Sequence, residues 1–250
     1  FMPRRTPIQL AAACALALVL ALSLTAGALA KGFSANLRVV GVNGKILAEK
    51  PVTTATTVVR TSPRASCFGA GSGGSGASVS IKGNTAMGLL AAASKTTGSL
   101  KPLAISDHFD FGIALCGIGS SVVRGESSWY LKIDHRALSV GGDRAKIKPG
   151  DEVLWDLAPS YPYPEELVLS APQQATAGVP FAVHVYAYNE KGKRKPMKGA
   201  TVTGATGPTD AQGKVMVTLT EPTLISAAIG DAIPSAQEPV CLAGKCPAGS

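Results

Sequence analysis

The chain has 250 residues, a net charge of +8, 46% apolar residues and 16% charged residues. This length allows one or two domains, and the composition excludes an intrinsically disordered chain. The positive charge comes without a nucleic-acid-binding motif, so we expect no nucleic-acid partner. After residue 30, no apolar run approaches the roughly 18 residues of a spanning helix, so we expect no membrane span in the mature chain.

The first thirty residues have the features of a secretory signal peptide. Arg4 and Arg5 supply a basic start, residues 10–22 form a short apolar run, and residues 28–30 (Ala-Leu-Ala) suit cleavage. A run of 13 residues, at about 1.5 Å each, is too short for a hydrocarbon core of about 30 Å. We therefore assign residues 1–30 to a signal peptide and expect a secreted, extracellular protein, free or associated with the cell surface.

Four cysteines follow the signal peptide: Cys67, Cys116, Cys241 and Cys246. An even number in an exported chain favours disulfides, and proximity favours Cys67–Cys116 and Cys241–Cys246. Closing a loop of about fifty residues contributes about 4 kcal/mol and a six-residue loop about 2 kcal/mol, so losing the first bond should harm folding more. The alternative, a zinc site, lacks a CxxC pair or a nearby histidine. Lipidation of Cys14 is disfavoured because most of the apolar run follows this residue.

A β-hairpin and a helix are expected next along the chain. Residues 35–42 have strand composition, Asn43-Gly44 is a strong hairpin-turn signal, and strand composition resumes over 45–59. The glycine- and serine-rich residues 69–78 predict a flexible loop. Helix formers fill residues 86–93, where Asn84 or Thr85 would cap the helix.

Short strands complete the first domain. Phe109, Phe111, Ile113 and Leu115 alternate with other residues, which predicts one half-buried strand. Further strands are expected at 129–133 and 153–155, on either side of a turn at 147–151. Two strands, one helix and several short strands predict a β-grasp-like domain over residues 33–157, with the helix on one face of the sheet.

A proline-rich linker is expected at residues 158–165, because proline fixes φ and lacks a donor. Short strands with turns between them then recur without a helix, which predicts an immunoglobulin-like β-sandwich over 166–247. The expected strands are 167–169, 181–188, 200–202, 215–219 and 224–229. The predicted fold class is therefore mainly β (α+β).

Four stretches of the first domain carry a family resemblance: the strand 37–42, the helix 85–93, Trp129-Tyr130 and residues 147–155 (IKPGDEVLW). With these stretches the chain resembles the transcobalamin-like C-terminal domain family, a β-grasp module of bacterial surface proteins. The resemblance implies an extracellular module that binds a cobalamin-like ligand. Family members often have a Val-Asn-Gly turn after the Trp-Tyr strand, whereas here Leu-Lys-Ile-Asp-His-Arg follows.

Three stretches of the second domain carry a second resemblance: residues 177–181, 198–202 and 209–215. They encode turns and core positions, and with them this domain is similar to bacterial immunoglobulin-like surface modules. The resemblance implies a spacer or an adhesive unit.

The sequence favours a protein without catalytic activity. Asp107-His108 and Asp134-His135 suggest a metal or acid–base site. Adjacent residues of a strand point to opposite faces, so the two histidines would converge only if their strands were neighbours. A serine nucleophile elbow is missing, and the cysteines are expected to be paired. We therefore expect no enzyme activity, no bound metal and no cofactor.

Trp129, Tyr130 and Trp155 are the candidate ligand-binding residues, because they could form one aromatic face. The alternative, which we favour, is core packing, since aromatic side chains bury large areas in small domains. An exposed Trp129 beside a groove would favour binding, and a fully buried one would favour packing.

A second candidate site is a cluster of positive charges. As a group these residues could contact an anionic cell-wall polymer or another surface protein; the alternative, which we favour, is a solvated hairpin tip around Asn189 and Gly192. The cluster consists of Lys191, Lys193, Arg194, Lys195 and Lys198. The expected function is a secreted, non-catalytic bacterial surface interaction or adhesion protein; the alternative is an extracellular protein that binds a small, cobalamin-like ligand.

Overall fold

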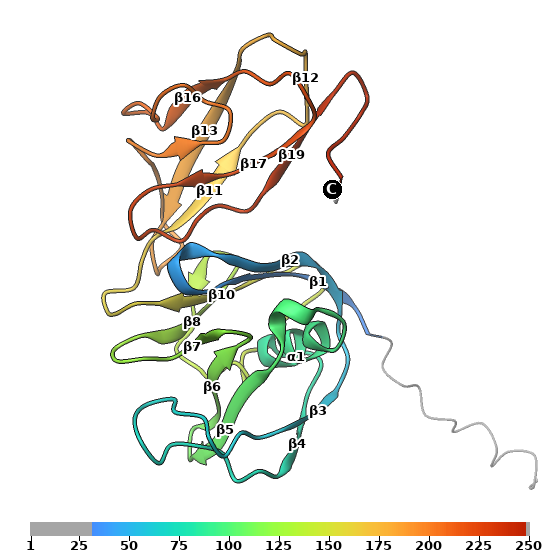
Figure 1. Cartoon of the computed structure of the whole chain (residues 1–250), viewed down its shortest axis with the longest axis vertical. Coiled ribbons are helices and arrows are strands. Elements are labelled where there is room, and N and C mark those ends of the chain that lie inside the picture. Colours follow the sequence, from blue (N-terminus) through green and yellow to red (C-terminus); the bar gives the residue numbers. More distant parts are fainter. Residues whose placement is uncertain (1–31, 249–250) are drawn as a thin grey trace, which may run out of the picture. The chain divides into compact units, whose positions relative to one another are not determined.

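Strands dominate the structure, a computed structural model that describes residues 32–248. The predicted signal peptide (1–30) and Cys14 lie outside the described residues. The described part contains one α-helix and several sheets, which confirms the mainly β prediction (Figure 1). The contacts group the chain from Phe33 onward into one compact unit. The division into two domains therefore stays a prediction.

The largest sheet contains five strands in the order β2-β1-β10-β8-β9. β1 and β10 are parallel neighbours, and the other pairs are antiparallel. The predicted hairpin at Asn43-Gly44 is confirmed: both residues have positive φ, which suits them to the turn between β1 and β2. The strands are β1 (Ser34–Val40), β2 (Ile46–Thr53), β8 (Ser128–Ile133), β9 (Arg136–Ala137) and β10 (Glu152–Ala158).

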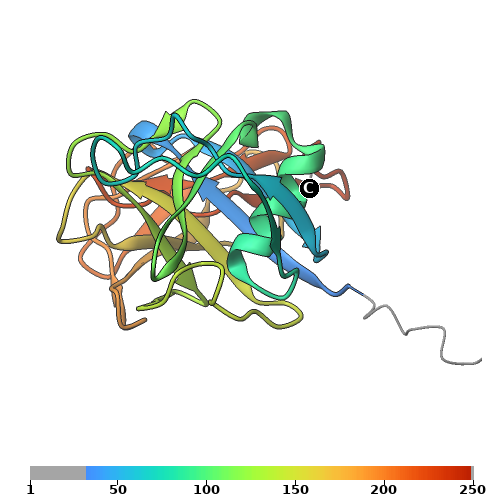
Figure 2. The same cartoon turned by 90° about the horizontal axis from the view of Figure 1, so that it is seen from below.

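The predicted helix is confirmed as α1, Ala86–Thr96. Thr85 caps it, because its hydroxyl accepts a hydrogen bond of 3.1 Å from the Gly88 amide. Two views show the helix beside β1 and β2 (Figures 1 and 2). The buried side chains of α1 and of the sheet form one hydrophobic core, so the helix covers one face of the sheet.

Side chains of this sheet alternate between two faces, as strand geometry requires. The helix face packs on α1, and the junction face packs on residues of the second half of the chain. On the helix face lie Leu37, Val39, Trp129, Leu131, Val153 and Trp155. On the junction face lie Arg38, Val40, Tyr130, Lys132, Leu154 and Asp156.

Two smaller sheets flank the helix-side core. The predicted single strand over residues 109–115 is wrong, because the chain reverses at Asp110 and Phe111. Phe109 pairs with Gly112 across this turn, and Gly112 has a φ of +121° that glycine adopts without strain. The Cys67–Cys116 disulfide is confirmed and ties β6 to the loop after β3. The strands are β3 (Thr57–Arg60), β4 (Ser78–Ile81), β5 (Leu103–Phe109), β6 (Gly112–Ile118) and β7 (Ser121–Val122).

The second half contains only strands and turns between residues 166 and 248 of the described chain. One sheet joins β11, β13, β14 and β16, another joins β12, β19 and β17, and β15 pairs with β18. Their buried residues form a second core, and the predicted Cys241–Cys246 disulfide is confirmed. The strands are β11 (Glu166–Ser170), β12 (Gln174–Ala175), β13 (Phe181–Tyr188), β14 (Arg194–Pro196), β15 (Thr201–Val202), β16 (Lys214–Val217), β17 (Thr223–Ile225), β18 (Ala227–Ala228) and β19 (Glu238–Leu242).

Candidate functional site

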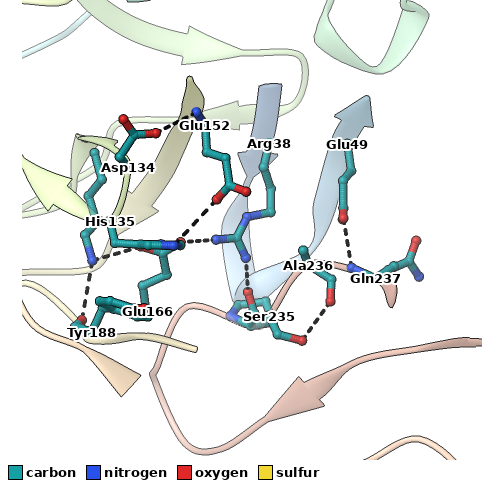
Figure 3. A network of polar contacts seen from close by, with 12 residues as sticks. Arg38, Glu49, Asp134, His135, Glu152, Glu166, Tyr188, Ser235, Ala236 and Gln237 are labelled. Carbon is teal, nitrogen blue, oxygen red and sulfur yellow. Dashed lines mark hydrogen bonds and ion pairs between the residues drawn. The ribbon is translucent and has the colours of Figure 1, made fainter. Parts of the chain in front are cut away.

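A buried group of charges joins the junction face to the second half (Figure 3). Glu166, the first residue of β11, accepts a hydrogen bond from the Arg38 guanidinium. The Nζ of Lys132 lies 3.0 Å from the Oε2 of Glu166, and both side chains are 1–2% exposed. The Nδ1 of His135 lies 3.1 Å from the Oε1 of Glu166. Arg38 also donates to the Pro234 carbonyl at 2.6 Å, so these contacts tie β1 and β8 to two segments of the second half.

In this group, burial and the charges of neighbouring side chains shift the pKa values in opposite directions. Burial acts to raise the pKa of Glu166, but the hydrogen bond with His135 and the charges of Arg38 and Lys132 lower it to about 2. Burial lowers the pKa of Lys132, against the charge of Glu166. Burial raises the pKa of Asp156, on the same face, to about 7. Glu166 is therefore ionised and paired, whereas Asp156 changes its charge near neutral pH.

His135 reaches Glu166 from a turn and not from a strand. Asp134 and His135 both have positive φ and connect β8 to β9. His108 lies in β5, which belongs to a different sheet. The His135 ring stacks on Tyr188 with the ring centroids 4.1 Å apart. The described residues contain no group of three or more His, Cys, Asp and Glu side chains that could hold a metal ion.

A cavity of about 470 Å³ lies beside β8 and β9, at one edge of the five-stranded sheet. Seven aromatic side chains line it, including both tryptophans of the chain. We call it the aromatic cavity, and its aromatic residues are Phe68, Phe111, Trp129, Tyr130, Trp155, Tyr161 and Tyr163. It thus collects all three predicted ligand-binding residues.

The three predicted residues reach the aromatic cavity from different faces of the sheet. Trp129 and Trp155 belong to the helix face. Tyr130 belongs to the junction face, where its ring stacks on Tyr163 with the centroids 4.2 Å apart. A single aromatic face formed by all three is therefore wrong, because Trp129 and Tyr130 are neighbours in one strand and point to opposite sides.

Three residues that line the aromatic cavity have a hydrogen-bond donor without a partner in the described part of the chain. The Nε1 atoms of Trp129 and Trp155 and the hydroxyl of Tyr130 are buried, and none has a hydrogen-bond partner among the described residues. Trp155 is 3% exposed and Tyr130 is 5% exposed. Buried polar groups in proteins are normally paired. Each of these three atoms has less than 1 Å² of accessible surface, so it is the rings of these residues, and not their polar atoms, that face the cavity.

Exposed apolar side chains surround the aromatic cavity. Phe68 is 65% exposed, Phe111 49% and Val140 50%. The rings of Phe68 and Phe111 pack around Phe109, at centroid distances of 5.3 and 4.9 Å from it. Phe68 directly follows Cys67, so the Cys67–Cys116 disulfide holds this part of the rim in place. A group of exposed apolar residues beside a concave site is typical of a binding surface.

The predicted basic cluster lies on the turn between β13 and β14 (Lys191, Lys193), in β14 (Arg194, Lys195) and just after β14 (Lys198). All five side chains are exposed, and Asn189 closes the turn by accepting hydrogen bonds of 3.0 Å from the Lys191 and Lys193 amides. Lys195 pairs with Glu165 at 2.9 Å, and the Arg194 guanidinium lies 4.3 Å from the ring centroid of Tyr186. The hairpin also contacts the first half, because the Ala137 amide donates to the Glu190 carbonyl at 2.9 Å.

Sequence reasoning missed Arg38, Lys132 and Glu166. The alternation of β1 and β8 would have placed Arg38 and Lys132 on the face opposite the apolar core. Such a face is ordinarily solvated, so the pattern held no signal that Glu166, 128 residues beyond Arg38, would cover it.

Comparisons with known proteins found no matching family model, no matching curated protein and no matching solved structure. In the part of the chain that the structure describes, the helices are too short or too polar to cross a membrane. The two disulfides indicate an oxidising, extracellular environment.

Proposed function

We propose that this chain is an exported, non-catalytic binding protein and that the aromatic cavity is its ligand site. The observation that carries this proposal is one concave cavity that seven aromatic side chains line and exposed apolar side chains surround. Ligand sites are typically concave and apolar, with a few polar groups that orient the ligand. The volume of about 470 Å³ suits a small molecule.

The finer fold assignment is part of the same proposal. A helix on one face of a mixed sheet with a parallel central pair, β1 and β10, supports a β-grasp-like first domain. Three small sheets around one core, in which every strand pair except β12 with β19 is antiparallel, support an immunoglobulin-like second domain. In this proposal the second domain holds the first through Glu166 and acts as a spacer.

Titration with N-phenyl-1-naphthylamine, an apolar dye that fluoresces in dry sites, tests the proposal. We expect saturable binding that weakens at least about tenfold in Trp129→Ala, a loss of about 1.4 kcal/mol. Tyr186→Ala, which removes an aromatic ring outside the cavity, is the matched control and should bind as the unchanged protein does. Cobalamin, the ligand implied by the family resemblance, is added as a competitor. Failure of the dye to saturate the unchanged protein would contradict the proposal.

A second candidate function is contact with an anionic polymer through the basic hairpin. Among the described residues, Lys195 is the one member of the cluster with an ion pair. The exposed cations of Lys191, Lys193 and Lys198 can therefore meet phosphate or carboxylate groups, and Arg194 adds its charge from above the Tyr186 ring. Replacing all five with serine should weaken retention on isolated cell walls at low salt, where charges are screened least. Unchanged retention would exclude this function.

A further inference from the structure

We propose that a second cavity, which we call the Asp156 cavity, binds a small organic cation with the carboxylate of Asp156 as its counter-ion. Its lining comes from the turn at residues 41–44, the loop between residues 122 and 127, the end of β10 and the segment 228–234. Its volume of about 640 Å³ lies within the range of small-molecule sites. It shares no lining residue with the aromatic cavity, so this site is additional to the ligand site proposed above.

Asp156 faces this cavity from the middle of the five-stranded sheet. β10 lies between β1 and β8, and Asp156 pairs with Val40 and Tyr130 of these two strands. Its side chain therefore leaves the sheet on the junction face. Ile233 packs on the same face and also lines the cavity, so the Asp156 side chain enters the cavity beside it.

The carboxylate of Asp156 has no partner in the described part of the chain. The residue is 5% exposed, and its side chain forms no hydrogen bond or ion pair with another described residue. Its oxygens are nevertheless not among the unpaired atoms that are sealed from solvent, a group that includes the indole nitrogens of Trp129 and Trp155. The oxygens therefore keep accessible surface, and this surface opens to the cavity that Asp156 lines. Buried acceptors are normally paired, so a donor from outside the chain is expected here.

The neighbouring cations are already engaged elsewhere. Arg38 and Lys132 pair with Glu166 on the same face. Burial raises the pKa of Asp156 to about 7, although the charges of Arg38 and Lys132 act to lower it. Tyr130, opposite Asp156 in β8, stays a neutral phenol because burial raises its pKa. A ligand cation would supply the counter-charge that these side chains do not, since an adjacent opposite charge favours the ionised carboxylate.

The walls of the cavity favour a cation with an apolar body. Its other charged residues, Arg124 and Asp231, are exposed and opposite in sign. Charge-assisted hydrogen bonds are strong where the local dielectric is low, so an ammonium, amidinium or guanidinium group suits the carboxylate. Most of the remaining lining is apolar and suits the rest of the ligand; it includes Val42, Val122, Leu157, Pro159, Ile233 and Pro234.

Benzamidine and benzamide are the matched probes that test this proposal. Both are flat and similar in size, but benzamidine is a cation and benzamide is neutral. By isothermal titration calorimetry at pH 8, we expect benzamidine to bind saturably and at least about tenfold more tightly than benzamide. Asp156→Asn keeps the shape of the side chain without its charge and should weaken benzamidine binding at least about tenfold. Asp231→Asn, which removes the exposed carboxylate of the same cavity, is the control and should change binding less than about threefold.

The pH dependence gives a second readout. Asp156 is neutral well below pH 7 and cannot then pair with a cation. Benzamidine affinity should therefore fall at least about tenfold from pH 8 to pH 5 in the unchanged protein but stay constant in Asp156→Asn. At pH 7, binding should release about half a proton, because half of the carboxyl groups are protonated when the pH equals the pKa. Calorimetry in buffers of different ionisation enthalpy measures this release, and it decides the matter alone if Asp156→Asn does not fold.

The opposite outcomes are equally clear. Absence of benzamidine binding, equal binding of both probes, or binding that Asp156→Asn retains would overturn the proposal. An equal loss in Asp231→Asn would place the cation at the exposed carboxylate and contradict the role of Asp156. None of these results depends on the binding of N-phenyl-1-naphthylamine, so failure here leaves the proposed function of the aromatic cavity standing.

Discussion

The two faces of the five-stranded sheet are both buried, but by different means. On the helix face, apolar side chains pack on α1, and the rings of Trp129 and Trp155 line the aromatic cavity. On the junction face, the buried Lys132 and the partly buried Arg38 pair with Glu166. The same sheet thus supports a candidate ligand site on one face and an ionic attachment to the second half of the chain on the other.

This difference shows what each face tolerates. An unpaired neutral donor, such as the indole N–H of Trp129 or Trp155, costs only about 1–3 kcal/mol. An unpaired buried charge costs far more, so the cations of the junction face need Glu166 at all times. We therefore expect changes on the junction face to affect stability most, and changes at the aromatic cavity to affect binding.

Loss of the Glu166 charge should have the largest effect. Glu166→Gln leaves the buried Lys132 and the partly buried Arg38 without the Glu166 counter-charge, which should cost about 3–5 kcal/mol in the free energy of unfolding at pH 7. Urea unfolding at pH 7 measures this loss of stability. Glu165→Gln, which breaks the exposed pair with Lys195, is the control and should cost less than about 1 kcal/mol.

The pH dependence of this variant sharpens the test. The pKa of Glu166 is lowered to about 2 from its ordinary value of 4.5. Its contribution is therefore present above pH 4.5 and is lost as the pH falls toward 2. The gap between Glu166→Gln and the unchanged protein should close over this range; a gap that stays constant would mean that the charge is not what stabilises the junction.

Removal of the Cys67–Cys116 disulfide, which lies beside the aromatic cavity, should have the next largest effect on stability. Cys67→Ser with Cys116→Ser opens a loop whose ends are 49 residues apart, which should cost about 4 kcal/mol. Cys241→Ser with Cys246→Ser opens a loop of 5 residues' separation and should cost about 2 kcal/mol. Thermal unfolding compares the two variants. Equal losses would contradict the dependence on loop length.

Asp156→Asn should stabilise the protein above neutral pH. Burial raises the pKa of Asp156 from 3.8 to about 7. The folded state therefore resists ionisation, and the resulting stability is present below pH 3.8 and lost as the pH rises through 7. A shift of about three pKa units corresponds to at most about 4 kcal/mol, which the neutral asparagine should recover in part at pH 8.

Urea unfolding of both proteins at pH 4 and pH 8 measures this gain. We expect similar stability at pH 4 and a more stable variant at pH 8. A variant that is less stable at both values would show that the Asp156 carboxylate contributes a favourable contact.

Gly142→Ala should have the smallest effect on stability and a clear effect on the cavity. The added methyl group would meet the Trp155 ring, and forced overpacking of this kind costs about 1–3 kcal/mol. The displaced indole should also weaken binding of N-phenyl-1-naphthylamine. Gly207→Ala, where a Cβ meets nothing within 4 Å, is the control. Unchanged dye binding by Gly142→Ala would place the ligand away from Trp155.

Local signals predicted much of the fold. Asn43-Gly44 marked a hairpin and Asn84-Thr85 marked the start of the helix, because turn and cap preferences depend on neighbouring residues alone; the structure selects Thr85 as the cap. The strand expected over residues 109–115 failed because its alternation continued through a turn that Gly112 permits. Strands β14 and β19 were not predicted, since short strands form through partners distant in the sequence.

The sequence by itself determined which side chains share a face. Side chains of a strand alternate between the two faces of the sheet. Arg38 must therefore lie on the other face from Leu37, and Lys132 on the other face from Leu131. Only the tertiary structure decided that both faces are covered, because burial depends on segments far apart in the chain. Glu166 lies 128 residues beyond Arg38. No local pattern relates the two, and their contact exists only because folding brings β11 onto the junction face.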